Sequence, residues 1–189
     1  VYKRQEYMEQ CRENEAAIVT GASSGIGATI SARLCKMGYE VFGIGRSFGS
    51  SFAEQFPDAA DNPLFHAVVC DLLDTEKMLK LVRGIVAEAG VTLLVNNAGI
   101  YANIPAEEIA SETFCDIIDV NVKGTFFMTR HFVDLMIANH YGKIINLCSA
   151  VGLRAAPGSI AYASSKFAVR GMTQALALDL GKYLSLIHI

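Results

Sequence analysis

The stretch Thr20-Gly21-Ala22-Ser23-Ser24-Gly25-Ile26-Gly27 follows an apolar run and opens a helical pattern. A strand, a glycine turn and a helix in this order form the context in which a dinucleotide's phosphates are held. Gly21 permits the tight turn, Gly25 lets the backbone approach a pyrophosphate, and Gly27 lets helix and strand pack closely. The N–H groups and the dipole at the helix N-terminus favour an anion. An ordinary glycine-rich loop is the alternative. The residues expected at the cofactor are Gly21, Ser23, Ser24, Gly25, Ile26 and Gly27.

Apolar, β-rich runs alternate with longer amphipathic stretches along the rest of the chain. Such alternation is typical of βαβ units, in which helices cover both faces of a parallel sheet. The chain has 189 residues, which fits one domain. We predict an α/β fold with a Rossmann-type, doubly wound parallel sheet. Strands are expected at Ala16–Thr20, Glu40–Ile44, Leu64–Cys70, Thr92–Asn96 and Lys143–Cys148, and helices at Gly25–Met37, Ser47–Phe56, Asp74–Ala89, Ser111–Asn139 and Ser159–Tyr183.

The end of the second expected strand indicates which cofactor is used. A site for NAD would place Asp or Glu there to hold the ribose 2′-hydroxyl. This chain has no acid in that stretch and carries Arg46 and Ser47 instead. A guanidinium and a hydroxyl can receive a 2′-phosphate through charge-assisted hydrogen bonds. The sequence therefore favours NADP(H) over NAD(H), unless Arg46 is simply a solvated loop cation.

The third and fourth expected strands end in residues that suit the same ligand. The carboxylate of Asp71 can accept a hydrogen bond from an adenine amino group, with Leu72 beside the ring; alternatively, Asp71 caps a turn. Asn97, Ala98 and Gly99 end the fourth strand, where small residues allow close approach of a cofactor and amides can tie neighbouring strands together. Because parallel strands share one carboxyl edge, we expect all these residues to converge there.

Three residues in the last quarter of the chain suggest proton chemistry. Tyr162 and Lys166 are four apart in a helical stretch and therefore share a face. A free phenol has a pKa near 10, and proton transfer near neutral pH needs that value lowered by up to about three, roughly 4 kcal/mol. A neighbouring ammonium acts in that direction. Ser149, at the end of the fifth strand, can hydrogen-bond a substrate oxygen as charge develops.

Taken together, these motifs resemble the short-chain dehydrogenase/reductase family. The resemblance rests on the glycine turn, Asn96-Asn97-Ala98-Gly99, Asn121, Ser149 and the Tyr162-x-x-x-Lys166 pair, and covers about residues 16–183. It implies hydride transfer between NADP(H) and a carbonyl or secondary alcohol, with Tyr162 as proton donor or acceptor and Lys166 also holding the nicotinamide ribose. It also implies that Asn121 relaxes a helix and organises a water relay toward the lysine, and that the two long helices, Ser111–Asn139 and Ser159–Tyr183, pair with other subunits in homodimers or homotetramers. Their apolar residues can equally cover only the chain's own sheet.

The resemblance leaves the substrate open. A 3-oxoacyl-carrier-protein reductase is the first expectation, with a small-molecule or acyl-carrier-bound carbonyl as substrate. Sugar, polyol and steroid dehydrogenases follow closely. Arg154, in the loop after Ser149, can meet an anionic substrate. A non-catalytic dinucleotide-binding sensor and an inactive fragment are the rival interpretations.

The two ends of the chain are related in an unusual way. Residues 1–5, Val-Tyr-Lys-Arg-Gln, and residues 184–188, Leu-Ser-Leu-Ile-His, can be encoded by strings that are reverse complements of each other. We interpret residues 1–5 and 184–189 as translated sequencing adaptor and residues 6–183 as the natural domain. Family members usually continue with a sixth strand, a substrate-covering lid and a seventh strand. The expectation is therefore a truncated, poorly stable and weakly active chain whose fifth strand has an unpaired edge.

Composition narrows the function classes further. A formal net charge of −3 provides no basic surface for nucleic acid, and no apolar run is long enough to span a membrane. A cytoplasmic protein with a small-molecule partner is predicted. The cysteines and histidines lack ligand spacing, so no metal site is proposed and the thiols are expected to be reduced. Strand alternation predicts that Cys148 is buried and inert.

Overall fold

The computed structural model describes residues 15–181, without the side chains of residues 86–88. The two segments interpreted as adaptor, residues 1–5 and 184–189, lie outside the described residues, as does the end of the last predicted helix.

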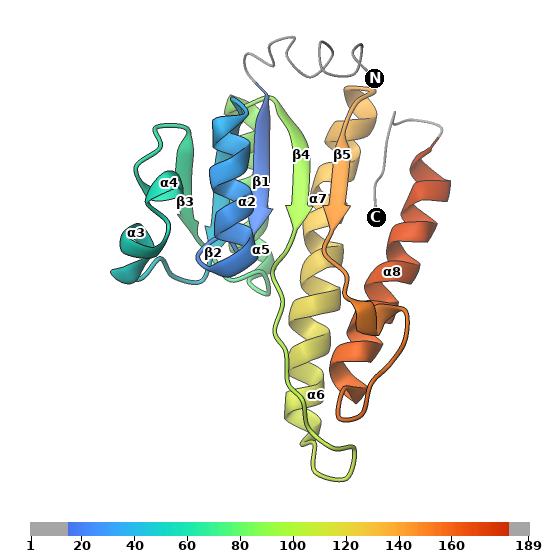
Figure 1. The fold of residues 1–189 in the computed structure, drawn as a ribbon. Coiled ribbons are helices and arrows are strands. Elements are labelled where there is room, and N and C mark those ends of the chain that lie inside the picture. The colour runs from blue at the N-terminus through green and yellow to red at the C-terminus, as the bar shows by residue number, and fades with distance from the viewer. Residues whose placement is uncertain (1–14, 182–189) are drawn as a thin grey trace, which may run out of the picture.

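Five parallel strands form the centre of the molecule (Figure 1). They are β1 (Ala16–Thr20), β2 (Glu40–Gly45), β3 (Phe65–Val69), β4 (Val91–Asn96) and β5 (Lys143–Asn146), in the spatial order β3-β2-β1-β4-β5. The chain moves from β1 outward to β3, then returns to the other side of β1. The reversal between β1 and β4 is a topological switch point, where doubly wound sheets bind their ligands. The predicted α/β class and the positions of all five strands are confirmed to within two residues at each boundary.

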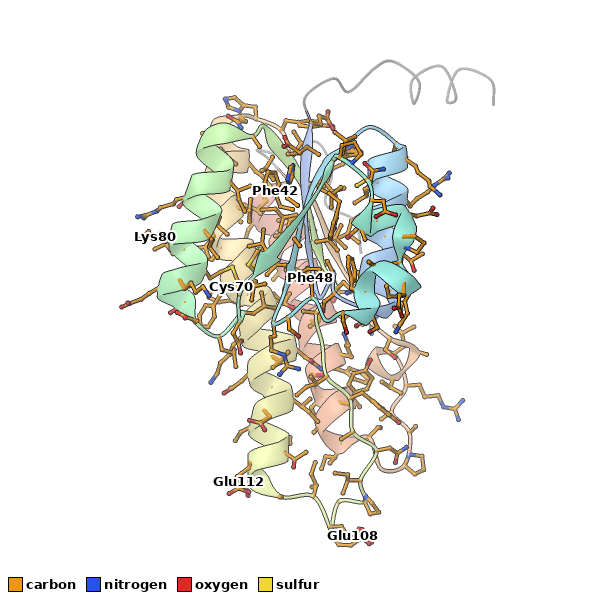
Figure 2. All side chains as sticks on the ribbon, turned by 90° about the vertical axis from the view of Figure 1, so that its left-hand side faces the viewer. Phe42, Phe48, Cys70, Lys80, Glu108 and Glu112 are labelled. Atoms are coloured by element: carbon orange, nitrogen blue, oxygen red, sulfur yellow. The ribbon has the colours of Figure 1, made fainter. Side chains whose placement is uncertain are left out.

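Helices cover both faces of this sheet, as Figure 2 shows edge-on. On one face Ala17 and Val41 pack with Leu34, and on the other Ile18 packs with Met78 and Phe132. The first face carries α2 (Gly25–Lys36), α3 (Ser51–Gln55) and α4 (Pro57–Ala60), and the second carries α5 (Thr75–Glu88), α7 (Thr125–Ala138) and α8 (Ile160–Leu180). The helix α6 (Ser111–Ile118) and the segment η1 (Asp119–Gly124) precede α7 and continue its line past the end of the sheet (Figure 1). Within residues 15–181, none of these helices is both long and apolar enough to cross a membrane.

The predicted helix at Ser47–Phe56 is too long: the segment holds only the short helix α3, which begins at Ser51, and a second short helix, α4, follows it. Pro57 disfavours the helical conformation at the residue before it, and Phe56 has φ −132° and ψ 56°. Helix α3 therefore stops at Gln55, and α4 begins at Pro57, a position where the missing N–H costs nothing. The phenylalanine rings Phe48, Phe52 and Phe65 pack together and fix these two helices against the sheet.

The predicted helix at Ser111–Asn139 is continuous but not regular. Its central six residues, Asp119–Gly124, form the π-helix η1 between α6 and α7. A π-helical turn is wider than an α-helical one and often marks a functional position. Asn121 lies within it and is buried. The local relaxation expected at Asn121 from the family resemblance is therefore present. Figure 1 shows that α6 lies beyond the carboxyl end of the sheet, in line with α7.

The fifth strand is shorter than predicted and ends at Asn146. Leu147 N still donates to Asn96 O at 2.9 Å, but Leu147 O accepts from Lys166 Nζ at 2.7 Å, so the ladder stops there. Cys148 consequently lies past the strand and is half-buried, which corrects the prediction of a buried side chain. Among the described residues, β5 pairs with β4 alone, so its outer edge carries no partner strand.

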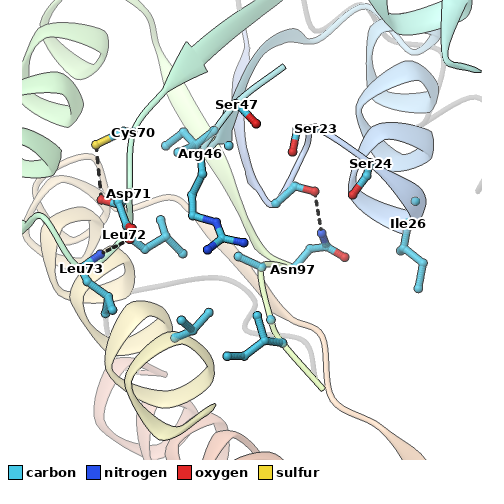
Figure 3. A pocket seen from close by; sticks show the side chains of 18 of the residues that line it. Ser23, Ser24, Ile26, Arg46, Ser47, Cys70, Asp71, Leu72, Leu73 and Asn97 are labelled. Carbon is cyan, nitrogen blue, oxygen red and sulfur yellow. Dashed lines mark hydrogen bonds between the residues drawn. The ribbon is translucent and has the colours of Figure 1, made fainter. Parts of the chain in front are cut away.

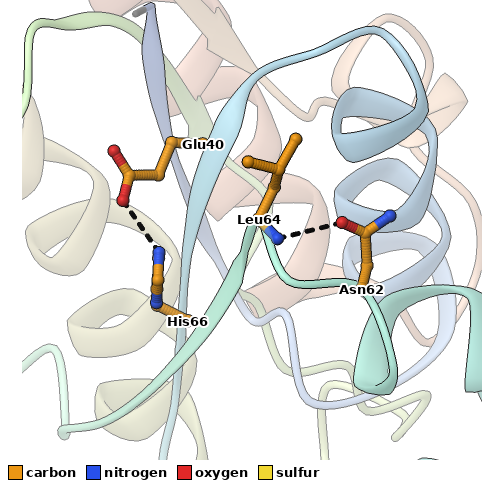
Figure 4. A network of polar contacts seen from close by, with 4 residues as sticks. All are labelled: Glu40, Asn62, Leu64 and His66. Carbon is orange, nitrogen blue, oxygen red and sulfur yellow. Dashed lines mark hydrogen bonds and ion pairs between the residues drawn. The ribbon is translucent and has the colours of Figure 1, made fainter.

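The opposite edge of the sheet is held by polar contacts at its amino-terminal end. His66 Nε2 of β3 lies 2.9 Å from Glu40 Oε1 of β2, and Leu64 N donates to Asn62 Oδ1 at 3.0 Å (Figure 4). These contacts lie away from the carboxyl edge, where the candidate site is found.

Candidate functional site

A cleft of about 600 Å³ opens at the carboxyl ends of the strands. Its size suits a small organic ligand. Figure 3 shows it between the glycine turn on one side and the turn after β3 on the other. Its lining includes most of the residues that the sequence predicted for a cofactor: Gly21, Ser23, Ser24, Gly25, Ile26, Arg46, Asp71, Leu72, Asn97, Ala98 and Gly99.

Backbone packing shapes the glycine turn at the cleft. A Cβ added to Gly27 would lie 2.2 Å from Gly21 O and 2.5 Å from Asn97 Nδ2, so no larger residue fits. Gly27 is buried beneath the turn instead of lining the cleft. Gly21 has φ +66°, a conformation that favours glycine. The close packing predicted for Gly27 and the tight turn predicted at Gly21 are both present.

The start of α2 is suited to an anion. No acidic residue lies in its first turn, and the side chain of its N-cap residue Ser24 makes no capping hydrogen bond. The first backbone N–H groups therefore face the cleft without a competing carboxylate. Together with the close-packed glycines, these features fit a pyrophosphate at this end of the cleft.

Arg46 reaches into the cleft from the end of β2. Figure 3 shows its guanidinium between the Asp71–Leu73 turn and Asn97. It is exposed, and no salt bridge joins it to an acid among the described residues. The site therefore has an uncompensated positive charge beside Ser47. Such a charge suits the 2′-phosphate of NADP(H).

Asp71 caps a turn, which the sequence left as the alternative to adenine binding. Its Oδ1 accepts from Leu73 N at 3.0 Å. The side chain also lines the cleft beside Leu72, so the turn fixes a carboxylate at the ligand. Burial raises the pKa of the neighbouring Cys70 thiol, which lines the same wall.

The two asparagines at the end of β4 tie the strands together, as predicted. Asn97 Nδ2 donates to Thr20 O at 2.9 Å, and Thr20 Oγ1 accepts from the N–H groups of Asn97 and Ala98. Asn96 Nδ2 donates to Asn146 Oδ1 of β5 at 2.8 Å and to Thr129 Oγ1 of α7 at 3.1 Å. These bonds fix the floor of the cleft to both neighbouring strands.

Asn121 connects the π-helix to two other parts of the site. Its Oδ1 accepts from Ile100 N at 2.8 Å, and its Nδ2 donates to Ile100 O at 3.0 Å and to Ser165 Oγ at 3.0 Å. One buried amide thus holds the segment after β4 and the face of α8. Ser165 Oγ donates in turn to Tyr162 O at 2.7 Å, which extends the network to the turn of α8 that carries the tyrosine.

Lys166 is buried on α8, with 5% of its surface exposed. Burial lowers the pKa of its ammonium, and the thiol of Cys148 opposes this shift. Nζ donates to Leu147 O and lies 5.6 Å from the centroid of the Tyr162 ring. The Cys148 thiol lies 3.4 Å from Lys166 O, so the end of β5 packs directly on this turn of α8.

Ser149 and Tyr162 approach the same region from different elements. Ser149 is the N-cap of the short helix η2 (Ala150–Gly152), and its Oγ accepts from Val151 N at 3.4 Å. A Cβ on Gly152 would lie 3.0 Å from Lys166 O, so η2 rests against α8. Tyr162 is half-buried in the first turn of α8.

Gly99 lies between the cleft and the pair Asn121 and Lys166. It lines the cleft, and a Cβ added to it would lie 3.1 Å from Asn121 Oδ1 and 3.8 Å from Lys166 Nζ. Tyr162 and Lys166 lie beside the cleft without being part of its lining. A ligand that fills the cleft would therefore reach the tyrosine and lysine at the Gly99 end.

Several residues at the site were missed by reasoning from the sequence. Ile100 follows directly on the predicted Asn-Ala-Gly segment and could have been found by extending it. Asp116 and Val120, from α6 and η1, line the cleft without any local signal. Tyr101 also gave no signal, yet its ring centroid lies 4.9 Å from that of Tyr162 with the planes at 86°.

The described residues hold no group of three or more His, Cys, Asp or Glu side chains arranged to bind a metal ion. Cys35, Cys70, Cys115 and Cys148 are free thiols. That no metal takes part stays a prediction.

Known proteins share both the sequence and the fold. A family model described as short chain dehydrogenase matches residues 15–188. The 3-oxoacyl-[acyl-carrier-protein] reductase FabG of Rickettsia bellii is 37% identical over 165 residues, which cover 87% of this chain and 66% of that protein. Gluconate 5-dehydrogenase of Gluconobacter oxydans is 34% identical over 168 residues, which cover 88% of this chain and 66% of that protein. The chain thus spans just under two thirds of these relatives.

Two solved structures illustrate the match in fold. A putative NAD(P) dependent gluconate 5-dehydrogenase from Beutenbergia cavernae with bound NADP superposes with a TM-score of 0.80 at 35% identity, covering 90% of this chain and 68% of that one. ElxO with NADP bound superposes with a TM-score of 0.84 at 28% identity, covering 93% of this chain and 71% of that one.

Proposed function

The chain belongs to the short-chain dehydrogenase/reductase family, and from this premise we propose that it is an oxidoreductase acting with NADP(H) on a carbonyl or a secondary alcohol. The observation that carries the proposal is the position of Lys166. Its ammonium is buried beside the Tyr162 ring and next to Gly99, at one end of a cleft whose other end suits a pyrophosphate.

Each residue of this end has a role in the proposed reaction. When bound, the cofactor supplies or accepts the hydride. In the reducing direction Ser149 Oγ holds the carbonyl oxygen as negative charge develops, and the Tyr162 hydroxyl donates the proton to it. Lys166 supplies a positive charge beside the phenol and a donor for the nicotinamide ribose. Asn121 positions the segment after β4 and the face of α8, and a water bound near it would relay protons toward Lys166.

NADP(H) is the proposed cofactor because of Arg46. Its guanidinium lines the cleft, beside Ser47 and without an acid at the end of β2. Bidentate, charge-assisted hydrogen bonds to a 2′-phosphate suit this side chain. The bound NADP in the two structures above supports the same choice.

The proposed substrate class is a 3-oxoacyl chain on an acyl carrier, as in the relatives named as reductases of this kind. Relatives named gluconate 5-dehydrogenase and 3beta-hydroxysteroid dehydrogenase keep sugar, polyol and steroid substrates as the alternative. Arg154 is exposed in the loop after η2, where it can meet an anionic carrier or substrate. We further propose a cytoplasmic homodimer or homotetramer that binds neither nucleic acid nor membrane.

The proposal is tested by cofactor binding followed by turnover. NADPH fluorescence should change on titration with the protein, and NADPH should be oxidised in the presence of members of a panel of 3-oxoacyl, sugar and steroid ketones. Tyr162→Phe should keep the fluorescence change and lower kcat about 10²- to 10⁴-fold, because the proton donor is lost. Tyr141→Phe is the matched control, because Tyr141 precedes β5 at the amino-terminal end of the strands, away from the cleft.

The rival interpretations give different results in the same experiment. Binding of NADPH without turnover of any ketone favours a dinucleotide-binding sensor. No binding of NADPH or NADH favours a fragment without a function of its own. Equal turnover by the wild type and Tyr162→Phe would contradict the proposed proton donor.

A further inference from the structure

An exposed aromatic side chain stands next to the proposed proton donor. Tyr101 is 62% exposed, and its ring meets the Tyr162 ring edge to face, with centroids 4.9 Å apart. No hydrogen bond to its hydroxyl is found within residues 15–181, so that group is free to meet a ligand. Single exposed apolar rings are common on protein surfaces, so the contact with Tyr162, not the exposure, is what marks this side chain.

The backbone that carries Tyr101 is anchored on both sides. Before it, the N–H and C=O groups of Ile100 are both bonded to the buried Asn121 side chain. After it, Ile104 N donates to Gly158 O at 2.8 Å, in the loop that leads into α8. The fold therefore holds the backbone on either side of Tyr101, and the edge-to-face contact with Tyr162 restrains the ring.

Tyr101 lies next to both the cleft and the proposed proton donor. Ile100, the residue before it, lines the cleft, and Tyr162, in the first turn of α8, contacts its ring. A carbonyl substrate held at Tyr162 would therefore have one of its two carbon substituents near this ring. A flat aromatic wall accepts an unbranched chain and clashes with a bulky group.

We propose that Tyr101 is a positioning and specificity-determining residue of the carbonyl site, which holds the Tyr162 ring and selects ketones with an unbranched substituent on its side. This inference rests on the proposed function and deepens it. The selectivity proposed for Tyr101 favours a straight oxoacyl chain over a fused-ring steroid.

Two isomeric ketones test the selection by the wall. 2-Hexanone has an unbranched chain, and 3,3-dimethyl-2-butanone has the same atoms in a tert-butyl group. Tyr101→Ala is expected to raise kcat/KM for the branched isomer relative to the unbranched one by tenfold or more, which is the usual range for a few methyl groups in a pocket. Tyr101→Phe keeps the ring and should leave the ratio within twofold. An unchanged ratio in Tyr101→Ala overturns the selection.

Positioning of Tyr162 is tested without turnover. With tyrosine labelled at ¹³Cζ, the Tyr162 resonance is assigned by its loss in Tyr162→Phe. Tyr101→Ala should shift this resonance, Tyr101→Phe should shift it less, and the control Tyr141→Ala should leave it in place. A Tyr162 resonance that Tyr101→Ala does not move overturns the positioning role.

The same measurements separate a failure of this inference from a failure of the proposed function. A wild-type protein that does not bind NADPH, or turnover that survives in Tyr162→Phe, contradicts the proposed function. The labelled resonance still decides whether Tyr101 positions Tyr162. Unchanged NADPH binding in Tyr101→Ala, with altered kcat and KM for the ketones, supports the inference, because damage to the fold would weaken both.

Discussion

The glycine turn and the proton site are built by different kinds of contact. The turn, Thr20–Gly27, is one short stretch of chain whose shape depends on backbone atoms lying close together, as at Gly27 and Gly21 O. The proton site draws Asn121, Ser149, Tyr162 and Lys166 from η1, η2 and α8. Side-chain hydrogen bonds hold it, above all those of Asn121 to Ile100 and Ser165.

Because the two regions are held by different contacts, each should tolerate different substitutions. A turn made by close backbone approach is sensitive to added volume. A site made by buried polar side chains is sensitive to the loss of one partner, because the others are then left unpaired. Added volume should therefore damage the cofactor end, and lost hydrogen bonds should damage the proton end.

The largest effect is expected from Gly27→Ala. The new methyl group would overlap Gly21 O at 2.2 Å, and the unfolding free energy should fall by about 3 kcal/mol or more. Gly25→Ala is the matched control, because nothing lies within 4 Å of its Cβ position and its cost is the φ of +49°, about 1 to 2 kcal/mol. Urea unfolding measures both. Equal losses would show that volume is not what limits the turn.

The second prediction concerns Asn121→Leu. This change leaves both backbone groups of Ile100 without their partner, and the unfolding free energy should fall by about 2 to 3 kcal/mol. Turnover should fall more than NADPH binding, because the glycine turn at the far end of the cleft is not touched. Asn139→Leu, exposed at the end of α7, should change the unfolding free energy by no more than about 0.5 kcal/mol. Loss of NADPH binding in Asn121→Leu would mean that the two regions are not independent.

The third prediction tests the charge at the cofactor end. Arg46→Asp should lower kcat/KM for NADPH relative to NADH by about 10- to 100-fold, because a carboxylate replaces the cation beside the 2′-phosphate. Steady-state kinetics with both cofactors measures the ratio. Arg33→Asp, on the exposed face of α2, is the control. An unchanged ratio in Arg46→Asp would remove Arg46 from the site.

The smallest effect should come from the buried charge at the proton end. Burial lowers the pKa of Lys166, so below 10.5 the unfolded chain binds more protons at this group than the folded one. The unfolding free energy contributed by Lys166 therefore rises with pH as pH approaches 10.5. Urea unfolding of Lys166→Met between pH 7 and 10 should lack this rise, and Lys80→Met, exposed on α5, should keep it. Parallel curves for the wild type and Lys166→Met would exclude a lowered pKa.

Local patterns in the sequence were enough to predict the strands, most helices and the cleft residues from Gly21 to Gly99. They overestimated the length of the helix at Ser47–Phe56, which begins only at Ser51, and failed at Cys148, where the strand ends early because Leu147 O is bonded to a lysine. They could not show that Asp71 caps a turn while facing the cleft. At Leu147 the failure has a clear cause, because its carbonyl accepts from Lys166 Nζ instead of continuing the strand pairing.

The amino-acid sequence alone establishes which chemical groups the protein carries. They are a turn that only small residues can form, an arginine where an acid would suit NAD, and a phenol one helical turn from an ammonium. These follow from covalent structure and from rules that act over a few residues. The tertiary structure decided how near the groups lie, how deeply Lys166 is buried, and that Tyr101 stands against Tyr162. Those facts depend on segments far apart in the chain, whose contacts form only when the helices pack on the sheet.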